Sequence, residues 1–211
     1  MVGIPDSLQR GCCSDGRLKM RADTVRRSVD NQGYITVQDE SLSALDLQEI
    51  LVRHASPRTM SSLLRPRALL FTRCTIGQQG EVVDLKDLNL LVPLKFENCC
   101  LPAVIDLRGA ATKRIEFRNS RLSVLRMSSD CVAGDLVLDG SCFTALLKNG
   151  GTTHGVFPSI QGQGMKICGK LSLKGCIALA GAHLSRAIIE GSVNCSGAFF
   201  MSPGYAGATW E

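Results

Sequence analysis

Short segments in which apolar and polar residues alternate recur along the middle of the chain. "LKFENCCL" (residues 94–101), "IEFRNSRL" (115–122) and "LVLDGSCF" (136–143) superpose without a gap at a spacing of 21 residues. Such alternation is typical of a β-strand with one buried face. Segments this short build a continuous core only by stacking on one another. The repeat therefore predicts short parallel strands stacked in register.

The superposition aligns three apolar columns and one column of small residues. The apolar columns are Leu94, Ile115 and Leu136; Phe96, Phe117 and Leu138; and Leu101, Leu122 and Phe143. The small column holds Cys99, Ser120 and Ser141. A free cysteine behaves as a small apolar residue, so its exchange with serine predicts that Cys99 fills a tight inner corner. We expect Cys100 to face outward, level with Arg121 and Cys142, and to be the more reactive thiol of the adjacent pair.

The pattern continues toward both ends of the chain. "LLFTRCTI" (69–76) opens the series, and "GKLSLKGCIA" (169–178) and "GSVNCSGAFF" (191–200) continue it. Weaker half-units lie between the full ones, which indicates two faces per turn. We predict a mainly β protein, a right-handed parallel β-helix of about five coils over residues 67–211. The alternative is an antiparallel β-sandwich, which would require hairpin turns such as Asn-Gly, and this pair occurs once, at 149–150.

Two parts of the chain depart from the repeat. Residues 144–164 are rich in glycine and are predicted to be a loop inserted into the helix. Residues 1–66 are predicted to form a helical N-terminal cap, with a basic helix at 16–29 and an amphipathic helix at 41–55. A nucleic-acid-binding arm is the alternative for the basic part of this segment.

The 41–55 helix carries its own signals. Its apolar stripe is predicted to consist of Leu42, Leu45, Ile50 and Leu51. Ser43 and Asp46 resemble an N-terminal capping pair. An amphipathic helix of this kind can cover the open first coil of a stacked-strand fold.

The net charge of +5 is concentrated in one segment. Residues 108–126 hold six basic residues and one acid, Glu116. Outward-facing Glu97, Arg118 and Asp139 alternate in sign along one column. The other bases have no partner evident in the sequence and form a candidate interaction patch: Arg108, Lys113, Arg114, Arg121 and Arg126.

The patch and the repeat suggest several kinds of partner. A protein partner of unknown identity, peripheral contact with anionic membrane lipid, and end-to-end self-association are all consistent with the sequence. Specific nucleic-acid binding is disfavoured because no aromatic residues interleave with the bases. No stretch approaches the length of a membrane helix and no secretory signal is evident, so we expect a cytoplasmic protein, peripheral to a membrane if it contacts one.

Candidate catalytic and metal-binding chemistry is sparse. The chain has 10 cysteines but no C-x-x-C pair, and adjacent cysteines in a strand point to opposite faces. His54, His154 and His183 are far apart in sequence, and no nucleotide-binding glycine motif is present. We therefore assign no catalytic residue, no metal and no cofactor.

Several phrases resemble a group of bacterial proteins. "PLKFENC" (93–99), "IDLRGA" (105–110) and "GDLVLDG" (134–140) are similar to the actinomycete-type β-helix proteins often labelled "membrane-associated oxidoreductase". The small residue two positions before a central Leu or Phe also resembles a degenerate pentapeptide repeat. The resemblance implies the β-helix fold. We expect a non-enzymatic scaffold or protein-interaction module, and the alternative is a membrane-associated oxidoreductase or a fragment of one.

Overall fold

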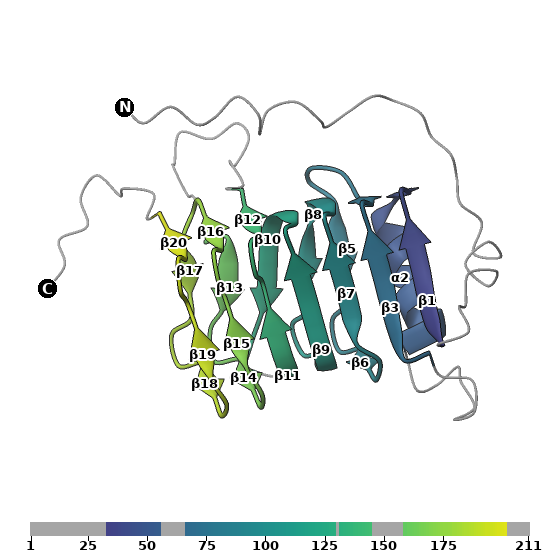
Figure 1. Cartoon of the computed structure of the whole chain (residues 1–211). Helices are drawn as coiled ribbons and strands as arrows, with labels where there is room; N and C mark the ends of the chain where they lie inside the picture. The colour runs from purple at the N-terminus through teal and green to yellow at the C-terminus, as the bar shows by residue number, and fades with distance from the viewer. Residues whose placement is uncertain (1–32, 56–65, 130, 145–157, 202–211) are drawn as a thin grey trace, which may run out of the picture.

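A computed structural model of the chain describes residues 33–55, 66–129, 131–144 and 158–201. Within these ranges the protein is mainly β, with two ten-stranded sheets and one helix. Every strand pair in them is parallel, which excludes the antiparallel β-sandwich. Figure 1 shows the strands following one another along the stack from the helical end to the C-terminal end. The basic helix expected at 16–29 lies outside the described residues.

The chain alternates between the two sheets, and we call each successive pass through both of them a tier. The path through the first sheet is β1 (Tyr34–Gln38), β3 (Ala68–Thr72), β7 (Leu94–Glu97), β9 (Ala111–Arg118), β11 (Val132–Val137), β14 (Lys166–Ile167) and β18 (Ile188–Ile189), with β6 (Asn89–Leu90), β15 (Leu171–Ser172) and β19 (Val193–Asn194) beside it. The path through the second is β2 (Ser41–Leu42), β4 (Thr75–Ile76), β8 (Cys100–Asp106), β10 (Arg121–Met127), β12 (Cys142–Phe143), β16 (Ile177–Ala178) and β20 (Phe199–Phe200), with β5 (Val82–Asp84), β13 (Ile160–Gly162) and β17 (Ala182–His183) beside it.

The sheets are longer than the sequence predicted. The described part of each path runs over seven strands, against about five expected coils. Strand β1 pairs with β3, so the first sheet begins at Tyr34, before the boundary expected after residue 66. Its step of 34 residues to Ala68 does not match the 21-residue spacing, and this hid the first tier.

The predicted columns are confirmed by the strand register. Leu94 pairs with Ile115, which pairs with Leu136, and Leu101 pairs with Leu122, which pairs with Phe143. All of these side chains are buried in a single hydrophobic core that draws on both sheets.

One apolar column is aromatic over three tiers. Phe71, Phe96 and Phe117 stack with ring centroids 4.8 Å apart and ring planes inclined by 11°. This spacing matches the distance between neighbouring strands, so in-register pairing alone brings the rings into contact.

The small column is held by hydrogen bonds as well as by packing. The backbone N–H of Cys74 donates to Cys99 Sγ, that of Cys99 to Ser120 Oγ, and that of Ser120 to Ser141 Oγ. Each of these side chains in turn donates to a carbonyl of the preceding tier, as Cys99 Sγ does to Phe71 O at 3.3 Å. Serine and cysteine can replace one another here because both are small and both can donate and accept.

Glycines allow the closest approach between tiers in a second column. A Cβ added to Gly134 would lie 1.9 Å from the carbonyl oxygen of Lys113, and one added to Gly191 would lie 2.2 Å from that of Gly169. A Cβ added to Gly169 would likewise lie 2.7 Å from the carbonyl oxygen of Gly134 and 2.1 Å from Asp135 Oδ1. The glycine that opens several repeat units is therefore required by backbone contact.

The helix α2 (Ala44–Ala55) begins at the predicted cap. The N–H of Ser43 donates to Asp46 Oδ2 at 2.9 Å, and the N–H of Asp46 donates to Ser43 Oγ at 3.1 Å. The predicted apolar stripe is wrong at Leu45, whose side chain is 75% exposed. Leu47 is buried in its place, because the helix begins at Ala44 and not at 41.

The predicted loop at 144–164 is shorter than expected. Ile160–Gly162 forms β13, which pairs with β10 and β17. Residues 145–157, including His154, lie outside the described residues. The chain leaves the second sheet after β12 and returns to it at β13, so the insertion replaces a corner that is short in the other tiers.

Candidate functional site

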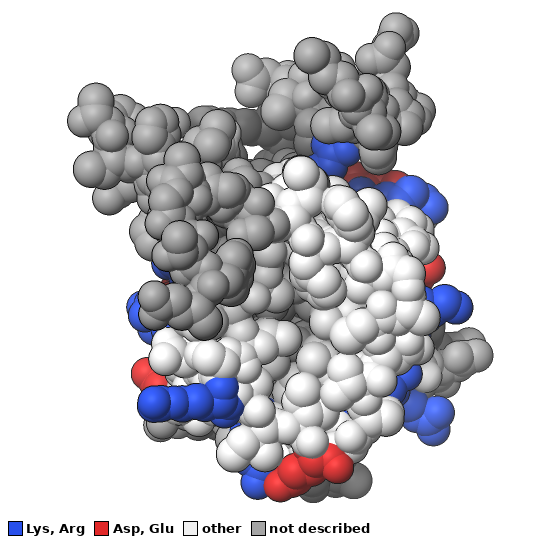
Figure 2. All heavy atoms as spheres, turned by 90° about the vertical axis from the view of Figure 1, so that its left-hand side faces the viewer, with Lys and Arg blue, Asp and Glu red and all other residues white. Residues whose placement is uncertain are grey.

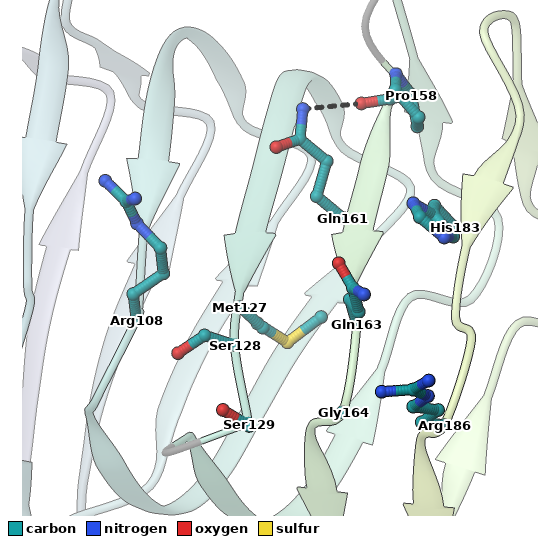
Figure 3. A pocket seen from close by; sticks show the side chains of 10 residues that line it. All are labelled: Arg108, Met127, Ser128, Ser129, Pro158, Gln161, Gln163, Gly164, His183 and Arg186. Carbon is teal, nitrogen blue, oxygen red and sulfur yellow. Dashed lines mark hydrogen bonds between the residues drawn. The ribbon is translucent and has the colours of Figure 1, made fainter.

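A hollow of the described surface lies at one corner of the second sheet. It has a cavity volume of about 530 Å³ and is open to solvent. Figure 3 shows its lining, which comes from four successive tiers: Arg108, Met127, Ser128, Ser129, Pro158, Gln161, Gln163, Gly164, His183 and Arg186. None of the described residues that line this groove is acidic.

A difference in turn length coincides with the groove. Arg126 pairs with both Asp106 and Gln161, so the turns that follow these residues are equivalent. The turn from Met127 to Val132 has one residue more than the turns before and after it, since Val132 pairs with both Ala111 and Lys166. Ser128 and Ser129 of this longer turn line the groove together with residues of the neighbouring turns.

The tier that begins at Leu94 and the tier that begins at Ile115 both span 21 residues, but they distribute these residues differently. Strand β8 holds one residue more than β10 between Leu101 and Val104, where the register shifts at Leu122 and Val124. The longer turn after Met127 restores the spacing. A gapless sequence alignment therefore hid the feature that makes the groove.

Arg108 lies at one side of the groove and is held by a buried acid. Its Nε and Nη2 donate to the two carboxylate oxygens of Asp106 at 2.9 and 2.8 Å. Burial acts to raise the pKa of Asp106, but the hydrogen bonds from the side chain and backbone of Arg108 outweigh it and lower that pKa. Lys86 adds a second cation 4.0 Å away.

Arg186 lies at the opposite side of the groove, with Met127 and the two glutamines between it and Arg108 (Figure 3). Gln161 is anchored, since its Nε2 donates to the carbonyl of Pro158 at 3.1 Å. His183 Nε2 lies 2.9 Å from Ser185 Oγ. The lining is thus rich in hydrogen-bond donors and includes a flexible apolar side chain at its centre.

The five residues of the predicted basic patch are spread over both sheets. Lys113 and Arg114 lie on β9 in the first sheet, and Arg121 and Arg126 on β10 in the second. Arg108 follows β8 and is the only one of the five that lines the groove.

Arg108 and Arg114, for which the sequence showed no evident partner, both form ion pairs in the structure. Arg108 pairs with Asp106, and Arg114 pairs with Glu116 and, at 3.5 Å, with Asp135 of the next tier. Glu116 also accepts from Arg118 Nε at 2.9 Å and is only 3% exposed. The 21-residue spacing predicted that Arg118 lies level with Glu97, and the strand register confirms this. The ion pair of Arg118, however, is with Glu116 on its own strand.

The other three bases differ in exposure. Lys113 is exposed, whereas Arg121 and Arg126 are half-buried. Arg121 lies level with Cys100 and Cys142, as predicted.

The cysteines are placed largely as packing residues. Cys74, Cys99, Cys131 and Cys176 are buried. A hydrogen bond with Cys74, together with burial, raises the pKa of Cys99. Cys100 is half-buried, so it is more accessible than Cys99, and the most accessible described thiols are Cys168 and Cys195.

A second candidate surface is the face of the last described tier. Val193 is 54% exposed, although Leu171, its partner in the preceding tier, is 2% exposed. Phe199 is 57% exposed. We call this apolar surface the terminal face, and its exposed members are Ile188, Val193, Phe199, Phe200 and Met201.

Sequence reasoning missed most of the groove. Its polar residues, such as Gln161 and Gln163, fall in the segment interpreted as an inserted loop. Arg186 does not belong to any motif recognised in the sequence. One signal was available: the serine pair at 128–129 sits in the turn that is one residue longer than its neighbours.

Metal-binding and membrane-spanning features are absent from the described ranges. No group of three or more His, Cys, Asp or Glu side chains there could hold a metal ion. No helix among these residues has the length and apolar character needed to cross a membrane.

Comparison with known proteins gives no relative for this chain. No family model, curated protein or solved structure matches it.

Proposed function

We propose that the protein is a non-enzymatic interaction module and that two copies associate through their terminal faces. We further infer that its two parallel sheets are the faces of a right-handed β-helix. The 21-residue register and the alternation of the chain between the sheets support this fold. The observation that carries the functional proposal is the exposed apolar tier at the C-terminal end of the described stack.

The terminal face offers both apolar side chains and strand edges. Strands β17, β18, β19 and β20 each pair on one side only among the described residues. An open strand edge pairs readily with another chain. The inward position of Val193 is buried at every earlier tier of the same column, from Leu94 to Leu171. A covering partner would complete that column.

Among the described residues, the opposite end of the stack has strands that pair on one side only, β1 and β2, but its apolar side chains Ile35, Val37 and Leu42 are buried. Helix α2 packs against β2, β5 and β6, and its Leu47, Ile50 and Leu51 are buried. Because the described residues at that end expose no apolar tier, head-to-tail stacking is disfavoured. Two copies joined through their terminal faces by a two-fold axis would form a closed dimer.

The charge distribution favours a second copy as the occupant. Residues 187–201 carry one charged side chain, Glu190, which pairs with Lys166 at 2.8 Å. Figure 2 looks onto this end and shows a mostly uncharged described surface, with Lys, Arg, Asp and Glu toward its rim. Two such faces meet without like-charge repulsion, even though each chain carries a net charge of +5.

The test measures mass in solution. Sedimentation equilibrium of the wild type should give a dimer that dissociates on dilution. Val193→Lys and Phe199→Lys should give monomers, because each copy would bury a charge against its twin. Leu45→Lys is the matched control, since Leu45 is an even more exposed apolar residue on α2 and should leave the dimer intact.

Two results would refute the proposal. One is a wild type that stays monomeric at the highest soluble concentration. The other is a dimer that the terminal-face variants and Leu45→Lys affect equally, which would place the interface elsewhere.

A further inference from the structure

We propose that the groove binds a small anionic molecule through Arg186, with phosphate or carboxylate groups as the recognised chemistry. This inference is independent of the dimer proposed above. It rests on the lining of the groove, on the way Arg186 is held, and on the contrast between Arg186 and the other arginine of the same conformation.

The groove has the size and lining of a ligand site. Its volume of about 530 Å³ lies within the range of small-molecule pockets, about 300–1,000 Å³. Its described polar side chains are two arginines, a histidine, two glutamines and two serines, with no acid among them. Such a lining supplies many hydrogen-bond donors and suits a ligand rich in acceptor oxygens. Met127 gives the body of a ligand an apolar floor.

Arg186 occupies a backbone position that favours glycine. Its φ is 57°, and the equivalent turn positions in earlier tiers include Gly109 at 71° and Gly164 at 69°. Left-handed backbone is unfavourable for a long side chain, and such residues often mark functional sites. An arginine at this point therefore calls for a compensating interaction.

The other described arginine with positive φ shows what that compensation looks like. Arg73, with φ 53°, donates to both carboxylate oxygens of Asp39 at 2.6 and 2.7 Å. No carboxylate among the described residues pairs with Arg186. Its guanidinium lies in the groove beside Gln163 and Gly164 (Figure 3), where an anionic ligand would take the part that Asp39 takes for Arg73.

Arg108 has a different role in this arrangement. Its Nε and Nη2 are committed to Asp106, so its charge is largely balanced. It closes the far side of the groove, and the anionic group itself belongs beside Arg186. Arg186→Gln is therefore a cleaner test than a change at Arg108, which would leave a buried carboxylate unpaired.

The experiment is isothermal titration calorimetry with two probes, inorganic pyrophosphate and citrate, at matched ionic strength. Tighter binding of pyrophosphate would identify phosphate chemistry, and tighter binding of citrate would identify carboxylate chemistry. Arg186→Gln should weaken binding by tenfold or more. Lys113→Gln removes the same charge from an exposed site on the first sheet and should change the affinity by less than twofold.

Two further variants separate a groove site from general charge attraction. Gln163→Trp should fill the groove and block binding without changing the net charge. Arg186→Gly should abolish binding but raise the melting temperature of the free protein, because glycine accepts the left-handed backbone. A purely structural Arg186 would instead lower the melting temperature when replaced.

Three results would overturn the proposal. They are no binding of either probe at millimolar concentration, equal loss in Arg186→Gln and Lys113→Gln, and binding unaffected by Gln163→Trp.

Discussion

At the scale of single residues, the small inner column shows why cysteine and serine exchange at Cys99, Ser120 and Ser141. Each member accepts a backbone N–H from the preceding tier and donates to a carbonyl there. These groups are buried, so a side chain that cannot accept would leave an N–H without a partner.

Substitution at Cys99 tests this role. Cys99→Ser should change the free energy of unfolding by less than about 1 kcal/mol, because serine keeps both hydrogen bonds. Cys99→Val leaves the N–H of Cys74 unpaired and should cost about 1–3 kcal/mol. Urea unfolding followed by circular dichroism measures both. Equal losses in the two variants would show that the column depends on packing alone.

Asp106 provides a pH-dependent contribution to stability. Its pKa is lowered in the folded protein, so its carboxylate stabilises the fold above the unfolded value of about 4 and loses that effect as pH falls through the folded-state pKa. Asp106→Asn should cost about 1–3 kcal/mol at neutral pH, and the difference from wild type should shrink on acidification toward about pH 3.

Asp84 is the matched control for this experiment. It occupies the same column one tier earlier, pairs with Lys86 and is half-exposed. Asp84→Asn should cost less than about 1 kcal/mol at neutral pH. A gap between wild type and Asp106→Asn that stays constant with pH would contradict the ion-pair assignment.

At the scale of elements, helix α2 shows how a boundary decides which residues are buried. The capping pair was predicted and is confirmed, but the helix starts three residues later than the expected range. Ser41 and Leu42 instead form β2, which pairs with β4. Hydrophobic periodicity cannot separate a strand from the helix that follows it when both are amphipathic.

The corrected stripe of α2 makes a direct prediction. Leu47→Ala should lower the free energy of unfolding by about 2–5 kcal/mol, because the side chain is fully buried. Leu45→Ala should change it by less than about 0.5 kcal/mol, since Leu45 is exposed. Chemical denaturation of the two variants distinguishes them. Similar losses in both would place Leu45 in the core after all.

At the scale of the whole molecule, the described residues form one stack of tiers around a single core, with helix α2 packed near its N-terminal end. The core is graded along the stack: inward side chains are buried through the middle tiers and become exposed at the terminal face. The thiols also differ in exposure, because the buried and the exposed cysteines occupy different positions in the stack.

Thiol labelling checks this arrangement over the full stack. Under native conditions near pH 8, iodoacetamide should modify Cys168 and Cys195 first. Cys131 and Cys176 should react last, because burial blocks access and raises their pKa to about 11 and about 12. Mass spectrometry of the peptides gives each rate, and labelling in denaturant is the control. Rapid native labelling of Cys176 would contradict its place in the core.

The sequence by itself determined the parallel register and the inner columns. In-register stacking places chemically similar residues above one another, so the 21-residue spacing alone identifies Phe96 with Phe117 and Leu101 with Leu122 as columns. The same repetition explains why the glycine that opens several units stacks on its counterparts.

Only the tertiary structure decided the partners of the charges, the ends of the stack and the groove. Ion pairs depend on side-chain directions, which is why Arg118 pairs with Glu116 and not with Glu97. The first tier is separated by long connections that break the period. The groove lies beside a turn whose one-residue difference in length is concealed by the constant 21-residue spacing. A repeat therefore specifies which residues stack, whereas departures from it create the surfaces on which function depends.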